Sequence, residues 1–293
     1  MKNRMIRLIP VLALLASFAL SACEKMVLDE ETTVVEQEGN VTIRASMFNI
    51  VPFDDTRAVQ DIADYCTRLC FVVYKDDTQV KKVLQKAGDS GFGQVSVPLE
   101  PGTYQLLVLA HSSNGNPSLT TPEKLQFANS DGFSDTFYYY GDLEVTGDSQ
   151  IREVMLQRAS SLVRIIATDE APAEAARVHL FYTGESGVFN AVTGWGGTVN
   201  SQQSVFVDID HESPQQVLDA YTFLRNETGE LKIDITVHDA AGNILSEKIL
   251  DHVPLKNRMV TEYRGNLFSE SVNEESFSFK AETSWEVFEQ HTF

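Results

Sequence analysis

LKIDITVHDAAGNILSEKIL, residues 231–250, is the stretch of sequence that decides the fold. Its opening residues alternate strictly between apolar and polar, the apolar ones being Leu231, Ile233, Ile235 and Val237. This period of two predicts a strand with one buried face. The turn-forming string DAAGN (239–243) comes next and leads into a second β-rich run. The stretch therefore predicts a β-hairpin.

Similar short β-rich runs, separated by turn residues, follow one another along most of the chain. A first set lies at 40–48, 69–75, 93–99, 103–110, 137–145 and 151–157. A second set lies at 160–168, 177–183, 204–210, 218–225, 231–239, 243–250 and 259–268. Only the strings at 58–66 (AVQDIADYC) and 170–177 (EAPAEAAR) look helical. Two sets of short strands predict an all-β protein of two tandem β-sandwich domains, at 40–157 and 158–268, rather than one large sheet.

Length and charge narrow the classes of function. The chain has 293 residues, of which 43% are hydrophobic, enough for the cores of two domains of ordinary size. Its formal net charge is −19 at pH 7, from 42 acidic and 23 basic residues. A surface that binds nucleic acid or anionic lipid needs the opposite sign. We therefore expect no nucleic acid partner.

Residues 1–22 have the three-part layout of a secretory signal. A basic start is followed by an apolar run at 8–20 and then by small residues. The apolar run is shorter than the ~20 residues that a membrane span needs. Residues 20–23, LSAC, resemble the lipobox of bacterial lipoproteins, which implies cleavage before Cys23 and acylation of its thiol and α-amino group. Several acyl chains give a stable membrane anchor where one gives only marginal binding.

Two further segments flank the expected domains. The acidic stretch 23–39 has no core-forming periodicity, so it is expected to be a tether between the membrane and the folded part. Because Glu24 rather than aspartate follows the cysteine, analogy with other lipoproteins favours the outer membrane. The tail 269–293 is acidic but carries large aromatic residues, among them Phe277 and Phe279. It is expected to be either a last strand or a strand that needs a partner.

Cys66 and Cys70 remain after the lipobox cysteine. Their spacing would place the Cα atoms ~6 Å apart on a helix, which a disulfide tolerates, but ~13 Å apart on a strand, which it does not. Because Cys70 lies at the start of the strand-like run LCFVVY (69–74), the pair is expected to straddle a boundary. Two buried free thiols are the favoured interpretation, and no further ligands are spaced for zinc.

No motif in the sequence predicts catalysis or metal binding. Residues 88–91, GDSG, resemble the nucleophile loop of trypsin-like serine proteases, but the histidine segment of that family is missing, so we interpret them as a turn. The six histidines are scattered without an HExxH pattern, and the acid pairs lack the EF-hand pattern. We therefore expect no catalytic residue, no cofactor and no metal, hence a protein that is not an enzyme.

The aromatic string FYYY (137–140) is the remaining candidate for ligand binding. Together with Trp195, these residues could offer a face on which sugars stack. Consecutive aromatic residues also suit a strand that packs on both sides. Packing is the favoured interpretation, and glycan binding stays an alternative.

Four features in this order are similar to the FimB-type minor fimbrial anchor family of Gram-negative Bacteroidales. They are the lipobox leader, PGTY (101–104) running into LLVLA, QRASSLVR (157–164), and VPLKNRMVTEYRGNLFS (253–269). The similarity runs over most of the mature chain, and its specificity lies in the order and spacing of the motifs. It implies two transthyretin-like, Greek-key sandwiches in tandem. It also implies a lipoprotein that holds a fimbrial shaft at the outer membrane through the lipid on Cys23.

The resemblance further implies a fimbrial shaft subunit as the partner, bound by strand complementation and without catalysis. Related fimbrillins are trimmed by an arginine-specific protease, and TRA (56–58) resembles the string near their trimmed region, which makes Arg57 a possible protease site. A shaft or tip subunit matured at Arg57 is therefore one alternative. A surface lipoprotein that binds glycan through Tyr138–Tyr140 and Trp195 is another.

Overall fold

The computed structural model describes residues 39–47, 62–197 and 201–269, together with the backbone of 277–279. All of these belong to one compact unit, Thr33–Phe293. The expected signal 1–22, Cys23, the tether, Arg57 and most of the tail 269–293 lie outside the described residues. Within the described ranges, no helix has the length and apolar character that crossing a bilayer requires.

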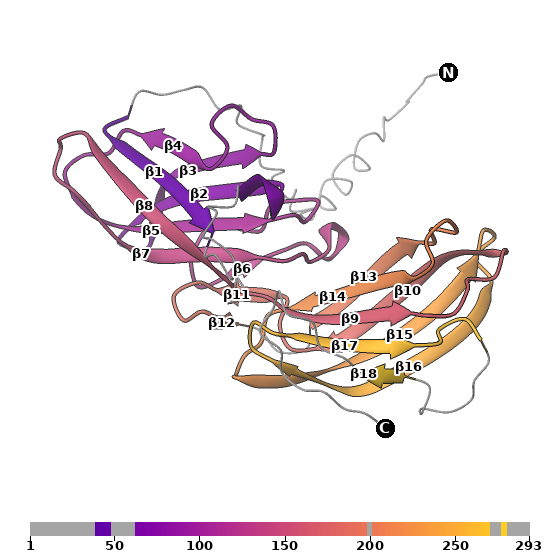
Figure 1. Cartoon of the computed structure of the whole chain (residues 1–293). Coiled ribbons are helices and arrows are strands. Elements are labelled where there is room, and N and C mark those ends of the chain that lie inside the picture. Colours follow the sequence, from indigo (N-terminus) through magenta and orange to yellow (C-terminus); the bar gives the residue numbers. More distant parts are fainter. Residues whose placement is uncertain (1–38, 48–61, 198–200, 270–276, 280–293) are drawn as a thin grey trace, which may run out of the picture. The chain divides into compact units, whose positions relative to one another are not determined.

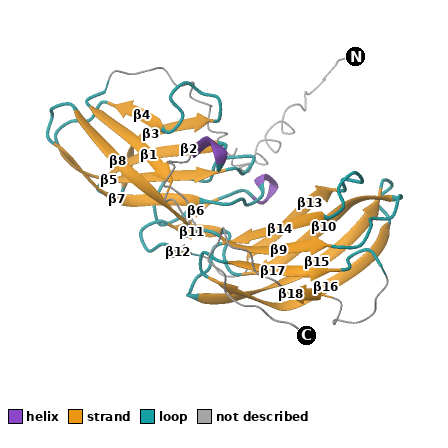
Figure 2. Cartoon of the chain, in the orientation of Figure 1, coloured by secondary structure: helices purple, strands orange, loops and turns teal. Residues whose placement is uncertain are grey.

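Strands make up most of the described chain (Figures 1 and 2). The first half contains β1 (Val41–Met47), β2 (Arg68–Lys75), β3 (Thr78–Lys86), β4 (Gln94–Val97), β5 (Gly102–His111), β6 (Leu125–Gln126), β7 (Phe137–Val145) and β8 (Gln150–Arg158). The second half contains β9 (Ser161–Ala167), β10 (Ala175–Gly184), β11 (Val188–Asn190), β12 (Trp195–Gly196), β13 (Ser201–Asp208), β14 (Gln216–Thr222), β15 (Thr228–Asp239), β16 (Ile244–Lys256), β17 (Val260–Gly265) and β18 (Phe277–Phe279). Two short 3-10 turns are the helical elements of these ranges, η1 (Ile62–Asp64) and η2 (Asn129–Asp131). The predicted all-β class is confirmed.

The N-terminal strands form two layers that are joined at one corner. One layer has the antiparallel order β3-β2-β5-β7, and the other has the order β8-β1-β4. In the second layer β1 pairs in parallel with β8, from Val41 opposite Gln150 to Met47 opposite Leu156. Strands β7 and β8 meet at only two residue pairs, which is the corner. Side chains from both layers, such as Ile43 and Leu106, fill the core between them.

The C-terminal strands form two separate sheets with the orders β14-β9-β17-β18 and β13-β10-β15-β16. Strands β15 and β16 are the hairpin that the sequence predicts at 231–250. The predicted buried face is confirmed, because Leu231, Ile233, Ile235 and Val237 are each at most 1% exposed. They pack against residues of the other sheet, including Val163 and Leu218. The result is a second β-sandwich.

The two halves repeat one connectivity. Strand β9 pairs in parallel with β17, as β1 does with β8. Strand β10 lies between β13 and β15, as β2 lies between β3 and β5. Strand β14 flanks β9, as β4 flanks β1. By this correspondence, β17 is the counterpart of β8.

The helix expected at 170–177 is wrong. Ala175 donates its N–H to the carbonyl of Pro172 at 2.9 Å in a turn, and β10 begins at Ala175 itself. From there a buried face with Val178 and Leu180 belongs to the strand, so tertiary burial outweighs the helix propensity of the alanines. Of the helix expected at 58–66, the described residues contain only the single turn η1.

Four strands were not predicted. Strand β3 lies at an edge and carries Lys81 and Lys82 side by side, next to a register shift opposite Val73 and Tyr74. The adjacent lysines hide the alternation by which a strand is recognised, and lysine is a common residue on edge strands. Strands β6, β11 and β12 have only two or three residues each, too few to show a period.

A hydrophobic cluster spans the two halves. Only two residues, Ala159 and Ser160, separate β8 from β9. Beside them, β6 of the first half pairs with β11 of the second, which in turn pairs with β12. The cluster combines residues of the first half with Phe189 and Phe223 of the second, and the rings of Tyr138 and Phe189 meet edge to face at 4.6 Å.

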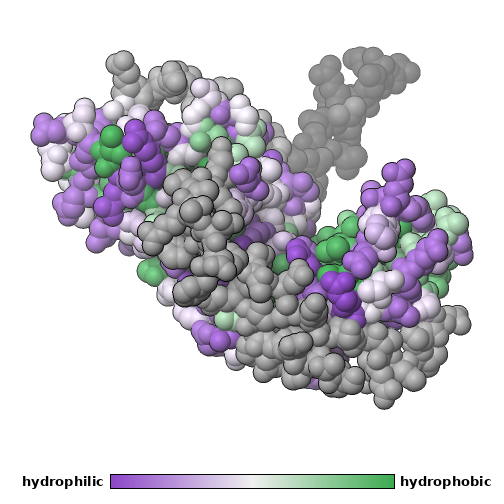
Figure 3. Space-filling view, viewed as in Figure 1, coloured by the Kyte–Doolittle hydropathy of each residue, from purple (hydrophilic) through white to green (hydrophobic). Residues whose placement is uncertain are grey.

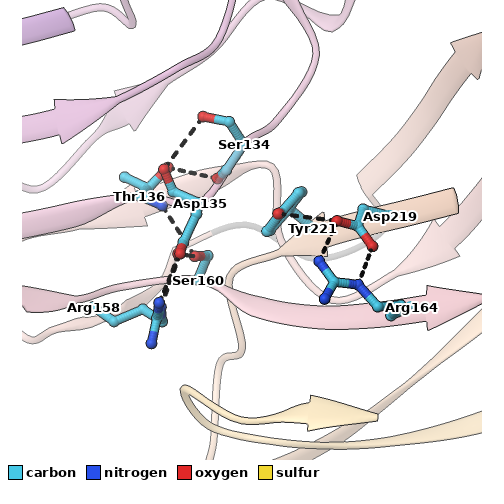
Figure 4. A network of polar contacts seen from close by, with 8 residues as sticks. All are labelled: Ser134, Asp135, Thr136, Arg158, Ser160, Arg164, Asp219 and Tyr221. Atoms are coloured by element: carbon cyan, nitrogen blue, oxygen red, sulfur yellow. Dashed lines mark hydrogen bonds and ion pairs between the residues drawn. The ribbon is translucent and has the colours of Figure 1, made fainter. Parts of the chain in front are cut away.

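Asp135 ties the end of β8 to this connection (Figure 4). Arg158 donates from Nε to one carboxylate oxygen at 2.9 Å and from Nη2 to the other at 2.8 Å. The hydroxyl of Ser160 donates to the same carboxylate at 2.9 Å and accepts the N–H of Thr136 at 3.1 Å. The side chains of Arg158 and Asp135 are 10% and 20% exposed. A bidentate ion pair with this little solvent is worth more than a surface one.

Asp169 fixes the chain where it leaves β17. Its carboxylate accepts the backbone N–H groups of Leu267, Phe268 and Ser269 at 2.7 to 2.8 Å. Burial raises the pKa of Asp169, but these backbone hydrogen bonds lower it, and the net effect is a lowered pKa. The segment that follows leads to β18, which pairs antiparallel with β17.

Replacement of Phe189 by alanine should destabilise both halves together, because the side chain is fully buried in the cluster that they share. We expect Phe189→Ala to lower the free energy of unfolding by about 3–5 kcal/mol, measured by urea denaturation. Phe206→Ala is the matched control: Phe206 is 54% exposed, so the loss should stay near or below about 1 kcal/mol. Equal losses in the two variants would contradict the shared core.

Asp169 should make stability depend on pH in the acid range. Because the folded-state pKa is lowered, its contribution is present above the unfolded pKa of about 3.9 and is lost as pH falls through the folded value. We expect the stability difference between wild type and Asp169→Asn, measured by urea denaturation, to shrink as pH falls below about 4. Asp148→Asn, an exposed residue of the β7–β8 turn, should give little difference at any pH. A pH-independent difference for Asp169→Asn would argue against this assignment.

Candidate functional site

Both cysteines of the described part are buried free thiols, as the sequence predicted. Cys70 lies on β2 within 4.0 Å of Nε2 of His111, on β5. The side-chain oxygen of Asn116 accepts from the same Nε2 at 3.2 Å, and the Cys70 thiol donates to that oxygen at 3.6 Å. Sequence reasoning missed this cluster, because Cys70 lies 41 residues before His111 and approaches it only through the pairing of β2 with β5.

The Cys70 cluster has the residue types of a thiol protease site but not its chemistry. Burial raises the pKa of the Cys70 thiol to about 12. Burial, aided by the charge of Arg68, lowers the pKa of His111 to about 4. The thiol is therefore protonated and the imidazole neutral at pH 7, whereas nucleophilic attack requires a thiolate. Asn116 and Cys70 both contact Nε2 of His111, whereas Nδ1 of His111 is buried without a hydrogen-bond partner. No third residue therefore orients the imidazole through Nδ1.

The other candidates from the sequence lie in a turn or pack against the core. Residues 88–91 lie in the turn between β3 and β4, as predicted, where the carboxylate of Asp89 accepts the N–H of Lys86 at 2.7 Å. Tyr138 is only 4% exposed, and Tyr139 and Tyr140 pack against two different core clusters. Tyr138 is therefore packed, as preferred, whereas Tyr139 and Tyr140 are only partly buried, and glycan binding there stays a prediction. Trp195, on β12, is half-buried.

No metal centre is visible in the part of the chain that the structure describes. Its His, Cys, Asp and Glu side chains form no group of three that could hold an ion. The acid pair Asp76 and Asp77 occupies the β2–β3 turn, where both residues adopt positive φ. Short acidic side chains tolerate this backbone conformation, so a turn accounts for them.

The outer edge of β8, residues 150–156 on the side away from β1, is the most distinctive surface of the first half. Residues 150–156 pair with β1 on one side. Among the described strands, none pairs with their other side, since β7 reaches β8 only at Gln157 and Arg158. Toward its end the strand alternates, with Val154 and Leu156 at most 2% exposed and in the core. The backbone of this strand can therefore accept a further strand.

Two large apolar side chains lie on the opposite face of β8. Ile151 is 58% exposed and Met155 is 55% exposed. Between them Glu153 reaches Arg44 of β1 at 3.9 Å, an exposed ion pair of small energetic value. Figure 3 shows hydrophobic atoms among hydrophilic ones over the region that Figure 1 labels β1 and β8. Alternating exposed apolar residues on an edge strand are unusual for a surface that stays in water.

The counterpart edge in the second half is covered. On the side of β17 away from β9, β18 pairs from Tyr263 opposite Phe279 to Gly265 opposite Phe277. The tail 269–293 thus contributes a last strand, which is one of the two outcomes expected from its sequence. The same position beside residues 150–156 of β8 has no strand from the described residues. The repeat in the fold therefore marks the outer edge of β8 as the place where a strand fits.

Three other edge strands, β3, β4 and β16, carry features that discourage pairing. Strand β3 has three lysines, Lys81, Lys82 and Lys86, and β4 is only four residues long. Strand β16 has two register shifts against β15. Lysines, short length and bulges are the usual means by which sheets avoid edge-to-edge association. Strand β8 has none of the three, and the edge strands β13 and β14 of the second half also lack them.

Solved structures resemble this chain at low identity. The fimbrial anchor protein Mfa2 from Porphyromonas gingivalis is 15% identical, with 82% of this chain and 94% of that chain covered and a TM-score of 0.42. A protein provisionally named as polysaccharide-binding, from Bacteroides thetaiotaomicron, is 13% identical, with 82% and 95% covered and a TM-score of 0.48. A protein provisionally named as a cell adhesion protein, from Bacteroides ovatus, is 16% identical, with 84% and 96% covered and a TM-score of 0.45.

Among sequences, no curated protein matches the chain. The similarity of its motifs to FimB-type anchors stays a prediction. A family model, by contrast, matches residues 31–286, which include both sandwiches and most of the tail. The chain therefore belongs to DUF6562, a family of unknown function.

Proposed function

We propose that this protein is a non-catalytic, membrane-held anchor or minor subunit of a fimbria, and that it binds the shaft by accepting a donor strand at the outer edge of β8. The observation that carries the proposal is the unpaired side of residues 150–156, at the position that β18 fills in the second half. A fimbrial shaft subunit is the partner that fits, because such a subunit can offer an extended strand.

Strand addition would use two kinds of contact. Backbone N–H and C=O groups on the free side of β8 would continue the sheet by hydrogen bonds. Alternate side chains of the donor would lie beside Ile151 and Met155 and remove these from water. Burial of apolar area at roughly 25 cal/mol per Å² then adds to the backbone contacts. The new strand would also be next to Arg158, whose bidentate pair with Asp135 holds the end of β8 in place.

Membrane attachment completes the proposal. Cys23 within the LSAC string would carry the lipid, and the acidic segment 23–39 would separate the folded part from the outer membrane. An anchor keeps Cys23, whereas a shaft or tip subunit trimmed at Arg57 loses it together with its lipid. The fate of the N-terminus therefore separates the proposed anchor from its first alternative.

Lysines placed on the outer edge of β8 should prevent attachment of fimbriae. We expect Ile151→Lys combined with Met155→Lys to deplete fimbriae from cells of the native host, because lysine charges block strand addition. Fold stability should change little, since both side chains are more than half exposed. Fimbriae would be quantified in cell and medium fractions, and thermal unfolding would be recorded on the purified variant.

The matched control places the same lysines on another edge. Ile244 and Ile249 of β16 are 58% and 53% exposed, so Ile244→Lys combined with Ile249→Lys makes an equivalent change of surface. This control should keep wild-type fimbriae. Normal fimbriae in the β8 variant would reject the outer edge of β8 as the acceptor.

The N-terminus of the protein from native cells should begin at an acylated Cys23, as read by mass spectrometry. In Cys23→Ala cells we expect fimbriae in the medium, because the base would no longer be held in the membrane. A wild-type protein that begins at Ala58 and is distributed along the shaft would instead make it a structural subunit. Unchanged fimbriae in Cys23→Ala cells would contradict the anchor role.

A further inference from the structure

A polar cavity of about 540 Å³ lies at one end of the β13-β10-β15-β16 sheet. Its walls come from all four strands and from the loop after β14, with Thr183, Glu185, Arg225, Glu230, Lys232 and His252 as the main polar side chains. Its volume is within the range of about 300–1,000 Å³ of small-molecule sites. Leu231 is the one aliphatic residue of its lining, so a ligand there would be held by hydrogen bonds.

The backbone around this cavity contains a β-bulge and two non-glycine residues with positive φ. Strand β16 has one extra residue where Leu231 and Ile233 of β15 face Val253 and Leu250, which is a bulge at Asp251 and His252. Bulges re-aim side chains and are frequent beside functional sites. His252 and, on the other side of the cavity, Glu185 adopt positive φ values of 52° and 33°. Non-glycine residues in this conformation are strained, and such strain concentrates at binding sites.

A buried carboxylate belongs to the cavity wall. The Glu185 side chain is 7% exposed and accepts the N–H of Arg225 at 3.1 Å, while Nε of Arg225 is 3.7 Å from the same carboxylate oxygen. A Cβ on Gly229 would lie 2.2 Å from the carboxylate, so only glycine leaves room for it. Burying a carboxylate is costly unless it is paired, and this one is positioned by its partners.

Each basic side chain of the cavity already contacts a carboxylate. His252 contacts Glu230 at 3.0 Å and Asp251 at 4.0 Å, Arg225 contacts Glu185, and Lys232 contacts Asp234 at 3.6 Å. Because Glu230 and Asp251 share His252, these contacts contain four carboxylates and at most three cations, so the cavity has no excess of positive charge to attract an acidic ligand. Carboxylates, guanidinium, ammonium and imidazole nevertheless retain free lone pairs and N–H groups beyond these pairs. A ligand that both donates and accepts many hydrogen bonds, without charge, matches this lining.

We propose that the cavity formed by β10, β13, β15 and β16 binds a short neutral saccharide. Sugar hydroxyls donate to the carboxylates of Glu230 and Asp251 and accept from Arg225 and Lys232, which line the cavity together. The chain's formal net charge of −19 also disfavours acidic saccharides, because it repels them. The site is independent of the outer edge of β8, because it lies entirely in the second half.

Titration with defined sugars, followed by NMR of the whole folded protein, tests the site. The probes are the trisaccharides of glucose, galactose and mannose, with trigalacturonate as an acidic probe and spermidine as a cationic probe. At least one neutral trisaccharide should bind with Kd near or below about 1 mM. Glu230→Gln should weaken this binding about fivefold or more through lost charge-assisted hydrogen bonds. Thr183→Trp should abolish it by filling the cavity.

Matched controls use the same sheet away from the cavity. Glu247→Gln on β16 and Thr236→Trp on β15 make the same chemical changes outside the lining, so binding should stay at the wild-type level. Thermal unfolding of each variant verifies that it is folded. The proposal is overturned if no neutral trisaccharide binds at about 10 mM, if Glu230→Gln and Thr183→Trp bind as wild type does, or if trigalacturonate or spermidine binds in preference.

Discussion

The parallel pairing of the first and last long strands of each half is the constraint on which the structure depends. In both halves this pairing closes the chain on itself, β1 with β8 and β9 with β17. Parallel neighbours cannot be joined by a tight turn, so the intervening strands must cross to the facing layer and back. The side chains enclosed in this way become the two sandwich cores. Each half is therefore held by contacts between residues that are distant in the chain.

This closure also explains where the candidate site lies. The last strand of each half, β8 or β17, pairs along one edge with the first strand of that half. Its other edge is open to a further strand. In the second half the tail supplies that neighbour as β18. In the first half the chain turns at once through Ala159 and Ser160 into β9, beside the Asp135 network, and no strand of the described residues pairs with the outer edge of β8. Among the described strands, the same connectivity thus leads to one edge with a partner strand and one edge without.

The sequence predicts the fold well where apolar and polar residues alternate along a strand. Alternation at 231–237 indicates the hairpin and its buried face, because a strand between core and solvent must alternate. Prediction from the sequence failed at 170–177. The alanine content there indicates a helix, but burial of Ala175 and Val178 requires a strand. The outer edge of β8 could not be predicted, since whether a strand has a second neighbour depends on pairing and not on composition. The cavity was hidden for the same reason: Glu185, Lys232 and His252 meet only through the register of three strands.

Closure by distant strands has a consequence for the order of folding. A chain that leaves the ribosome or crosses a membrane with its N-terminus first presents Val41 long before Gln150, its partner in the sheet. Until β8 follows, β1 has only the four residue pairs that it makes with β4. Structures dominated by such long-range pairs fold slowly and expose unpaired strands meanwhile. The first half can therefore be completed only after its last strand has emerged, which makes protection of the nascent chain against aggregation part of what this fold requires.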